Sequence, residues 1–417
     1  MNLILKAATV IDPSSPYHNQ TIDIQVKDGV ITDIDAFIEA KEGVEEIKLD
    51  TLFVSPGWFD SSVSLGEPGY EERETIRNGL DVAAKSGFTS IALNPDTLPV
   101  TDTSASVGFL KGISLNNPVD LYPIGALTVK SDGLNMAELY DMKQAGAIAF
   151  GDFKKPVKNP NLLKIALLYA QNFNGLVLSF PQDHTIAGKG NVNEEEQSTI
   201  LGLKGIPALA EELQVSRDLF LLDYTEGKLH IPTISTAKSV SLIRAAKANG
   251  AQVSCSVAAH HLVLTDSELT TFDTNYKVLP PLRTQKDVDA LLKGIEDGTI
   301  DMVTSDHQPM DVEHKKVEFD NAEYGTIGLE SIFGILNPIL GVEKTVSMLT
   351  QGKSVFGVKN STIDKGNQAD VSLFTPKGST PFTKEHILST SKNSAFLEKT
   401  ITGKVYGIIS NGKIVLK

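Results

Sequence analysis

The sequence "PGWFDSSVSLGEPGYEERETI", residues 56–76, contains the transition on which the architecture of this chain depends. An apolar run at residues 52–59 is typical of a buried strand, and it ends in a polar turn followed by a helical pattern at residues 71–86. Strand, turn and helix in this order are the building block of a parallel sheet. The stretch therefore predicts an α/β protein, and it places two small hydroxyls, Ser62 and Ser64, directly after the strand.

The same alternation continues to about residue 357. The candidate strands read LFVSPGWF, TSIALNP, DLYPIGAL, AIAFGD, GLVLSF, KLHIPTIS, QVSCSV and DMVTSD. Helical patterns between them cover residues 71–86, 135–144, 162–172, 206–224, 237–249 and 285–295, and several are followed by a glycine suited to a C-cap. Eight repeats in about 300 residues favour a (β/α)8 TIM barrel. A doubly wound open sheet is the alternative.

Both ends of the chain read as short strands instead. The first fifty residues contain NLILKAATVID, TIDIQVKDGVITDID and VEEIKLD, and the tail contains ADVSLFTP and KVYGIISNGKIVLK. Asn411-Gly412 in the tail is a hairpin signal. Because the termini of a domain often lie close together, we expect residues 1–52 and 358–417 to form one β-sandwich domain beside a barrel of residues 53–357.

Composition narrows the possible functions. The chain has 417 residues, of which 41% are hydrophobic, and a net charge of -14. An acidic surface disfavours nucleic acid and anionic membranes as partners. No apolar run approaches the length of about 20 residues that a membrane span needs, so we expect a cytoplasmic protein. Cys255 is the only cysteine and lies in an apolar run, which predicts a buried, inert thiol and leaves a nucleophile as the alternative.

In a barrel of this kind the functional side chains follow the carboxyl ends of the strands. In chain order these positions hold Asp60, Ser62, Ser64, Asn94, Asp96, Asp152, Ser179, Thr233, His260, His261, Asp306 and His307. A hydrolytic metal site needs several converging histidines or carboxylates. Only three of the eight histidines in the chain fall on this ring.

The stretch "PGWFDSSVSLGEPGYEERETIRNGLDVAAKSGFT" resembles the signature of the dihydroorotases, which belong to the amidohydrolase superfamily. The resemblance continues through "NPDT", "AIAFGDF", "LGLKGIPALAEE", "HIPTIST", "AAHHLVLTD", "YKVLPPLR", "DMVTSDHQP", "GTIGLES" and "NQADVSLFTP", and so covers essentially the whole chain. It implies a barrel with a β-sandwich. It also implies a hydrolase of pyrimidine biosynthesis that interconverts N-carbamoyl-aspartate and dihydroorotate with one or two zinc ions.

This sequence departs from the pattern at the residues that the resemblance implies for metal and substrate. The implied metal positions are occupied by Ser62, Ser64, Asp152, Ser179, Thr233 and Asp306. Gly66 stands where the family has a substrate-binding arginine, and Asp96 and Leu279 stand where it has asparagines. Of the implied machinery only Asp306, the position of the general base, is retained.

Elementary chemistry predicts what these changes do. Hydroxyl groups of serine and threonine are poor zinc ligands, and the two carboxylates of Asp152 and Asp306 cannot hold zinc tightly. Without a metal, no bound water has its pKa lowered toward ~7, so Asp306 would have no activated nucleophile. The substrate is a dianion, and losing an arginine while gaining Asp96 replaces attraction by repulsion. We therefore expect no zinc cofactor.

Several alternatives remain open for individual residues. Ser62 and Ser64 are either hydroxyl nucleophiles or small polar filler, and Asp306 with His307 is either an acid–base pair or a hydrogen-bonded remnant. His260-His261 fits buried structural histidines better than ligands, and His184 is either a loop residue or within reach of the site. The carboxylates of Asp96, Asp152 and Asp306 could bind Mg²⁺ or Ca²⁺ if they converge.

The sequence as a whole predicts a catalytically inactive dihydroorotase-like protein with a structural or regulatory role in pyrimidine biosynthesis. The resemblance implies aspartate carbamoyltransferase, or a second copy of this chain in a homo-oligomer, as the partner. The competing hypothesis is an active dihydroorotase or another cyclic amidohydrolase that has an unusual metal arrangement and uses Asp306 as general base.

Overall fold

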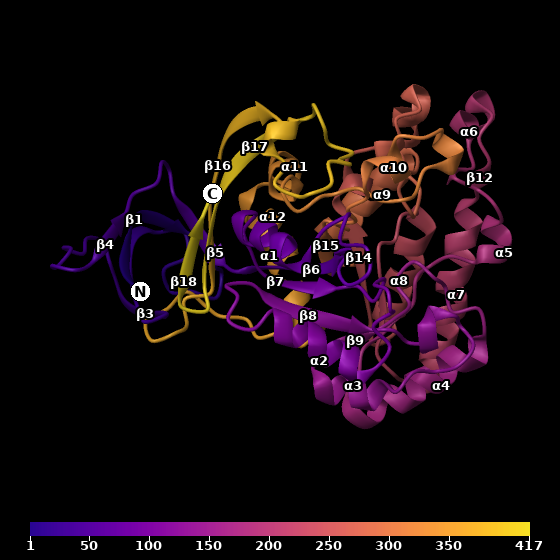
Figure 1. Ribbon diagram of the computed structural model, residues 1–417, viewed down its shortest axis with the longest axis horizontal. Coiled ribbons are helices and arrows are strands. Elements are labelled where there is room, and N and C mark those ends of the chain that lie inside the picture. The colour runs from indigo at the N-terminus through magenta and orange to yellow at the C-terminus, as the bar shows by residue number, and fades with distance from the viewer.

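The computed structural model describes residues 1–417, and a closed parallel barrel forms its larger part (Figure 1). Its eight strands are β6 (Trp58–Val63), β7 (Phe88–Leu93), β8 (Asp120–Gly125), β9 (Ala149–Phe150), β10 (Val177–Leu178), β13 (Leu229–Ile231), β14 (Val253–Ala258) and β15 (Met302–Thr304), hydrogen-bonded in that order. The barrel closes where Val63 pairs in parallel with His307, and the Ser64 N–H donates to the His307 carbonyl at 2.7 Å. The predicted barrel is confirmed, and the open sheet is wrong.

Helices cover the outside of the barrel. They are α1 (Ile76–Lys85), α2 (Ser104–Ile113), α3 (Leu139–Ala145), α4 (Pro160–Ala170), α7 (Ala208–Thr225), α8 (Ala237–Ala248), α9 (Gln285–Glu296), α11 (Ile332–Leu340) and α12 (Val342–Thr350). Short helices and a two-stranded ribbon lie in the loops: α5 (His184–Ala187), α6 (Glu196–Leu201), α10 (Val312–Lys315), α13 (Gly352–Val355), β11 (Val192–Asn193) and β12 (Gly205–Ile206). No helix combines the length and the apolar character needed to cross a membrane.

The six helices predicted from the sequence are all present, and the largest shift is at the start of α1. The pattern predicted a helix from residue 71, whereas α1 begins at Ile76 because the Thr75 hydroxyl caps it by accepting a hydrogen bond from the Asn78 N–H at 3.2 Å. Helices α2, α11 and α12 were not predicted. The sequence of α2, SASVGFLKGI, contains two glycines, which weaken a helical pattern.

The two ends of the chain form a second sheet. Its strands run in the order β18 (Lys413–Leu416), β17 (Thr400–Ser410), β16 (Val371–Pro381), β5 (Phe53–Pro56), β1 (Asn2–Val10), β2 (Thr21–Lys27) and β3 (Val30–Asp35), and β4 (Glu45–Ile47) pairs with β1. These strands make the β-sandwich around a core of 18 buried residues. The predicted hairpin joins β17 to β18, with Asn411 and Gly412 both at positive φ.

The strand expected at residues 52–59 is in fact two strands in different sheets. β5 pairs with β16 in the terminal sheet, and β6 starts the barrel at Trp58. Gly57 lies between them, where an added Cβ would come within 2.1 Å of the Thr89 hydroxyl. Only glycine lets the backbone pass this close, so the crossing from sheet to barrel lies just after Pro56 rather than at residue 53.

The single tryptophan packs at this crossing. Trp58 is fully buried, its ring lies 5.1 Å from that of Phe333 and 5.4 Å from that of Phe374, and its indole N–H donates to Ser55 at 3.0 Å. Phe374 belongs to β16 and Phe333 to α11, so one aromatic cluster joins the barrel to the terminal sheet. Burying each such ring contributes on the order of 2–3 kcal/mol.

Candidate functional site

Asp60 holds the exit of β6 against the exit of β15. Its carboxylate accepts hydrogen bonds from the Ser62 N–H at 3.0 Å, from the Ser305 N–H at 2.9 Å and from the Thr304 hydroxyl. Burial raises the pKa of Asp60, and these hydrogen bonds act in the opposite direction. All three partners of Asp60 lie where β6 and β15 end. The carboxylate therefore holds these two strand ends together and is not free to react.

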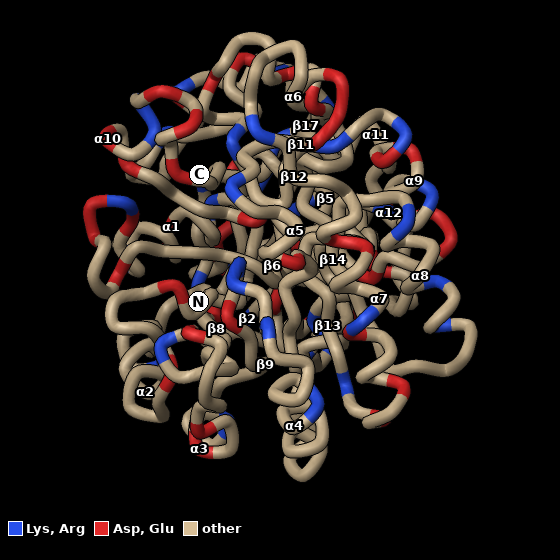
Figure 2. The backbone as a smooth tube through the Cα atoms, turned by 90° about the vertical axis from the view of Figure 1, so that its right-hand side faces the viewer, with Lys and Arg blue, Asp and Glu red and all other residues tan.

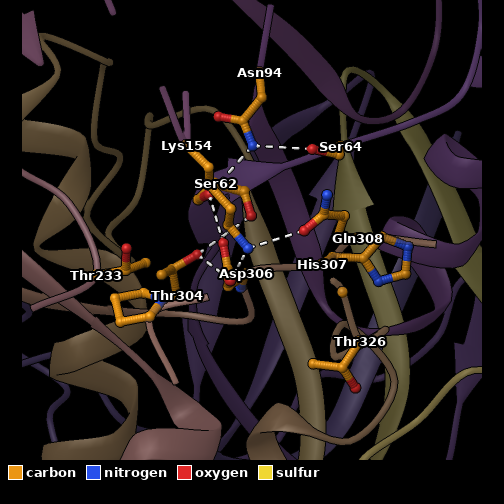
Figure 3. Close-up of polar contacts among 12 residues, drawn as sticks. Ser62, Ser64, Asn94, Lys154, Thr233, Thr304, Asp306, His307, Gln308 and Thr326 are labelled. Atoms are coloured by element: carbon orange, nitrogen blue, oxygen red, sulfur yellow. Dashed lines mark hydrogen bonds and ion pairs between the residues drawn. The ribbon is translucent and has the colours of Figure 1, made fainter. Parts of the chain in front are cut away.

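The two serines belong to one hydrogen-bonded chain (Figure 3). The amide nitrogen of Asn94 donates to the hydroxyls of Ser62 and Ser64, both at 3.2 Å, and the Ser62 hydroxyl donates to Asp306 Oδ1 at 3.2 Å. The sequence placed Asp306 on the same ring as the serines but did not predict this contact. Asp306 is therefore a carboxylate base within reach of the Ser62 hydroxyl. Its other oxygen, however, is bound to Lys154.

Lys154 is the residue that the sequence analysis missed. Its ammonium nitrogen lies 2.8 Å from Asp306 Oδ2 and donates to Gln308 Oε1 at 2.9 Å (Figure 3). The side chain of Lys154 is 10% exposed and that of Asp306 2%. Burial raises the pKa of Asp306, and the positive charge of Lys154 counteracts that rise. The signal was available: Lys154 follows Asp152 by two residues in the turn after a barrel strand.

The cavity that these side chains enclose is very small. Its volume is about 20 Å³, which is room for roughly one water molecule, and it is lined by Ser62, Asn94, Lys154, Thr233, Asp306 and apolar neighbours. A substrate the size of a pyrimidine ring does not fit beside Ser62. A nucleophilic role for Ser62 therefore has no space in which to act.

Of the other implied ligand positions, Asp152 and Ser179 bind neighbours outside this cluster, whereas Thr233 borders it. The Asp152 carboxylate accepts from the Thr128 N–H at 2.9 Å and from its hydroxyl at 2.6 Å. The Ser179 hydroxyl donates to Asp218 at 2.6 Å. Thr233 lines the small cavity and sits at a positive φ of 49°.

These side chains do not fit zinc. Nowhere in the chain do three His, Cys, Asp or Glu side chains gather in a way that could hold a metal ion. Asp96, Asp152 and Asp306 do not converge on one point. They therefore do not form the Mg²⁺ or Ca²⁺ site that was the alternative. The one retained carboxylate faces an ammonium group, which repels a metal cation.

All three ring histidines are buried, and His261 and His307 each have one bonded ring nitrogen, whereas neither ring nitrogen of His260 has a hydrogen-bond partner. His261 Nε2 lies 3.0 Å from the Pro280 carbonyl, and His307 Nδ1 accepts from the Gly328 N–H at 3.2 Å. Burial lowers the pKa of His260, His261 and His307 and keeps the rings neutral. His184 is exposed at the start of α5 and does not line the cavity. Cys255 is buried, and burial raises its pKa to about 12, which confirms an inert thiol.

A wider cavity of about 410 Å³ lies beside the small one and shares Pro95, Phe153 and Lys154 with it. An added Cβ at Gly66 would lie 1.7 Å from the Tyr70 carbonyl oxygen, so the backbone leaves no room there for an arginine. Leu279 packs into an apolar cluster with Phe180. Asp96 lines the cavity, and burial raises its pKa to about 6.

Comparison with known proteins agrees with the resemblance seen in the sequence. Residues 51–239 match the protein-family model described as dihydro-orotase-like. A dihydroorotase of Pelotomaculum thermopropionicum is 39% identical over 100% of this chain and 99% of its own length. A dihydroorotase of Geobacter metallireducens is 36% identical over 100% of both chains.

Solved structures show the same fold. L-hydantoinase (dihydropyrimidinase) from Arthrobacter aurescens matches with a TM-score of 0.85 at 22% identity, over 100% of this chain and 96% of that one. Dihydropyrimidinase from Brevibacillus agri matches with a TM-score of 0.83 at 20% identity, over 100% and 95%. The full-length similarity to the two dihydroorotases establishes that the chain belongs to the dihydroorotase family.

Proposed function

We propose that this chain is a catalytically inactive member of the dihydroorotase family that acts as a structural or regulatory component of pyrimidine biosynthesis. The observation that carries the proposal is the ion pair of Lys154 with Asp306, at the strand end where the family places a metal ligand and general base. An ammonium group supplies positive charge there, but it has no open coordination position and cannot activate a water as zinc does.

Two further observations support the proposal. The hydroxyls at positions 62 and 64 are occupied with Asn94 and Asp306, and the enclosed cavity has room for about one water. At the substrate end, only glycine fits at position 66, because a Cβ there would collide with the Tyr70 carbonyl. Asp96 adds a carboxyl group to the lining of the wider cavity. Metal chemistry and recognition of a dianionic substrate are thus weakened by independent changes.

The decisive experiment measures zinc and turnover on the same preparation. We expect the purified chain to contain much less than one zinc per chain by mass spectrometry, and to leave both N-carbamoyl-aspartate and dihydroorotate unchanged. A dihydroorotase relative that has histidines at the positions of Ser62 and Ser64, purified and assayed in parallel, serves as positive control. Stoichiometric zinc, or turnover abolished by Asp306→Ala, would overturn the proposal in favour of an active amidohydrolase that uses Asp306 as base.

The partner is tested separately. We propose aspartate carbamoyltransferase, because its product is the substrate of the family's reaction and a preserved fold without a preserved site suits a binding role. Co-expression with the transferase of the same organism should give a stable complex on size exclusion, with altered transferase activity. If the two proteins elute separately at tens of micromolar and the transferase kinetics are unchanged, this partner is wrong.

A further inference from the structure

Four lysines line one cavity among the loops at the carboxyl end of the barrel. The cavity has a volume of about 480 Å³ and is bordered by Lys315, Lys316, Lys384 and Lys392, and we call it the lysine cavity. The only acidic residue in its lining is Asp273, although the chain as a whole has a net charge of -14. Charge of one sign in a concave surface focuses the electric field and attracts ions of the opposite sign.

None of the four lysines forms an ion pair with a carboxylate. Lys315 Nζ donates to the Glu323 carbonyl at 2.9 Å, and Lys392 Nζ donates to the carbonyls of residues 387 and 389 at 2.9 and 2.6 Å. Lys316 and Lys384 are exposed, and their ammonium groups make no hydrogen bond within the chain. Two of the four charges are therefore free to bind a ligand.

Positive charge is also built into the wall of the cavity. Lys315 is only 6% exposed, and Lys277, whose charge acts on it, is 2% exposed. Lys277 Nζ donates to the Phe319 and Asp320 carbonyls at 2.8 and 3.0 Å, so both buried lysines have carbonyl groups and no carboxylate as partners. A buried ammonium group without a counter-charge costs free energy, and an anion in the cavity would offset that cost.

Acidic residues near the cavity are engaged with other groups. Figure 2 shows red as well as blue segments beside α10. Asp311, at the start of α10, lies 2.6 Å from His314 Nδ1 and does not line the cavity. Asp273, which does, accepts a hydrogen bond from the Asn275 N–H at 2.9 Å. The chain itself therefore leaves the lysines with an excess of positive charge.

The cavity is held open by hydrogen bonds between its loops. The Thr274 hydroxyl donates to the Lys315 carbonyl at 2.6 Å, and the Met310 N–H donates to Asn393 Oδ1 at 3.0 Å. Asn393 is 4% exposed and also donates to the Gln308 carbonyl at 3.0 Å. These contacts join three segments that are far apart in the sequence, so a ligand would find the site already formed.

The kinds of side chain in the lining favour phosphate groups. An ammonium group binds phosphate as a point charge, whereas carboxylates are best recognised by the planar fork of arginine, and no arginine lines this cavity. Its volume is within the range of small-molecule sites and far exceeds one phosphate ion. Met310, Val312 and Leu397 add apolar surface for an organic part of the ligand.

We propose that the lysine cavity binds a small organic phosphate that carries two or more phosphate groups. Met310 lines both this cavity and the wider cavity of the barrel mouth, so the two sites are neighbours, but they share no charged residue. The proposal does not depend on whether the barrel is catalytically active, because none of the four lysines belongs to the site around Asp306.

The test is isothermal titration calorimetry of the full chain with inorganic tripolyphosphate as the probe. In about 50 mM salt at neutral pH, where ionic attraction is only partly screened, we expect saturable binding of one tripolyphosphate per chain. Orthophosphate, with fewer charges, should bind at least about 10-fold more weakly. Butanetetracarboxylate, which has a similar charge but no phosphate, should also bind at least about 10-fold more weakly.

Two double variants separate the cavity from general ionic attraction. Lys316→Ala/Lys384→Ala removes the two lysines that have no partner in the chain, and it should weaken binding of tripolyphosphate at least about 10-fold. Lys41→Ala/Lys204→Ala removes the same charge at two exposed lysines outside the cavity, and it should change the affinity less than about 2-fold. All four positions are exposed, and circular dichroism checks that both variants are folded.

Proton uptake gives a second readout at Lys315. Burial, and next the positive charge of Lys277, lowers the pKa of Lys315 to about 7, so a bound anion should raise this pKa and draw in part of a proton at pH 7. The other charged groups around Lys315 are Asp273, Glu323, Lys154, the remaining lysines of the cavity, and His314 with Asp311. Titrations in two buffers of different ionisation enthalpy measure the uptake, and Lys315→Met should abolish it.

The proposal is wrong if tripolyphosphate does not bind at about 5 mM under these low-salt conditions. It is also wrong if the two double variants lose affinity equally, because the binding would then reflect the overall surface. Equal affinity for butanetetracarboxylate would exclude selection of phosphate. Binding of poly-glutamate without binding of tripolyphosphate would assign the cavity to an acidic segment of another protein.

Discussion

A buried lysine–aspartate pair lies at each end of the barrel, and the two pairs differ in which member is buried more deeply. At the carboxyl end, Asp306 is 2% exposed and Lys154 10%. At the amino end, Lys353 is 1% exposed and its partner Asp370 22%. The distance between the charged atoms is 2.8 Å in both.

The two pairs therefore serve different purposes. Lys353, on α13, also contacts the Thr89 hydroxyl at 3.4 Å, and Asp370 directly precedes β16, so this pair joins the barrel to the terminal sheet. Lys154 joins one barrel loop to another and neutralises a carboxylate that is otherwise surrounded by hydroxyls and amides. When the lysine of a pair is removed, the aspartate is left without its cation. The stability lost should depend on how deeply that aspartate is buried, and this can be measured.

The largest loss is expected for Lys154→Met, which leaves the buried Asp306 without a cation. We expect about 3–5 kcal/mol of destabilisation at pH 7.5, measured by urea unfolding followed through Trp58 fluorescence. Because burial raises the folded-state pKa of Asp306, the loss should shrink as the pH falls toward 5 and the carboxyl group takes up a proton. Lys155→Met, at the exposed neighbour, should change stability by less than about 0.5 kcal/mol. Equal effects of the two variants would contradict the importance of the pair.

Lys353→Met should cost less, about 1–2 kcal/mol, although this lysine is the more buried of the two. Methionine keeps most of the length of the buried side chain without its charge, and Asp370, being partly exposed, regains water. The same urea titration measures the effect, with the exposed Lys359→Met as control. A loss as large as that of Lys154→Met would show that exposure of the remaining partner does not set the cost.

Asp96 sharpens the comparison, because it is a carboxyl group of the same mouth without a paired cation. Burial raises its pKa to about 6, so ionising it in the folded state costs stability as the pH rises from about 4 through 6. Asp96→Asn should be more stable than the wild type by about 1 kcal/mol at pH 7.5 and equal to it near pH 4. A difference that does not vary with pH would mean that the Asp96 carboxyl does not titrate in this range.

The smallest change is expected for the double variant Lys154→Met/Asp306→Asn, which removes both charges. Asp306 has a positive φ of 48°, a conformation that asparagine adopts readily, and the amide oxygen can still accept from Ser62. We expect stability within about 1 kcal/mol of the wild type, and therefore a large coupling energy in the double-mutant cycle. A double variant as unstable as Lys154→Met would show that Lys154 matters for packing rather than for charge.

The barrel was predictable because each of its strands and most of its helices can be recognised from a short stretch of sequence. Each strand is a short apolar run with turn signals at its end, and the six predicted helices have periodic patterns of their own. The boundary at residues 52–59 was missed because one continuous apolar run reads as one strand, whereas the close contact of Gly57 with Thr89 divides it between two sheets. α11 was missed because it is apolar almost all round, which hides its period.

The candidate site could be predicted only in part. That serines and a threonine stand at positions 62, 64, 179 and 233 is a property of the sequence, and the poor metal affinity of hydroxyl groups follows from their chemistry. The position of Lys154 two residues after Asp152 made it a candidate for the site, but its pairing with Asp306 could not be derived, because a lysine in a turn is normally solvated. The reach of its long side chain across the barrel mouth to Asp306, 152 residues away, is a tertiary contact.

The sequence by itself determined the family, the order of strands and helices, and the absence of histidines and of the arginine at the implied ligand positions, because each of these is a matter of residue type and spacing. The tertiary structure alone decided that an ammonium group faces Asp306, that the space left beside Ser62 is about 20 Å³, and that lysines of two distant loops line one cavity. The physical reason is that charge pairing, cavity volume and exposure depend on distances between residues far apart in the chain, and local patterns carry no record of those distances.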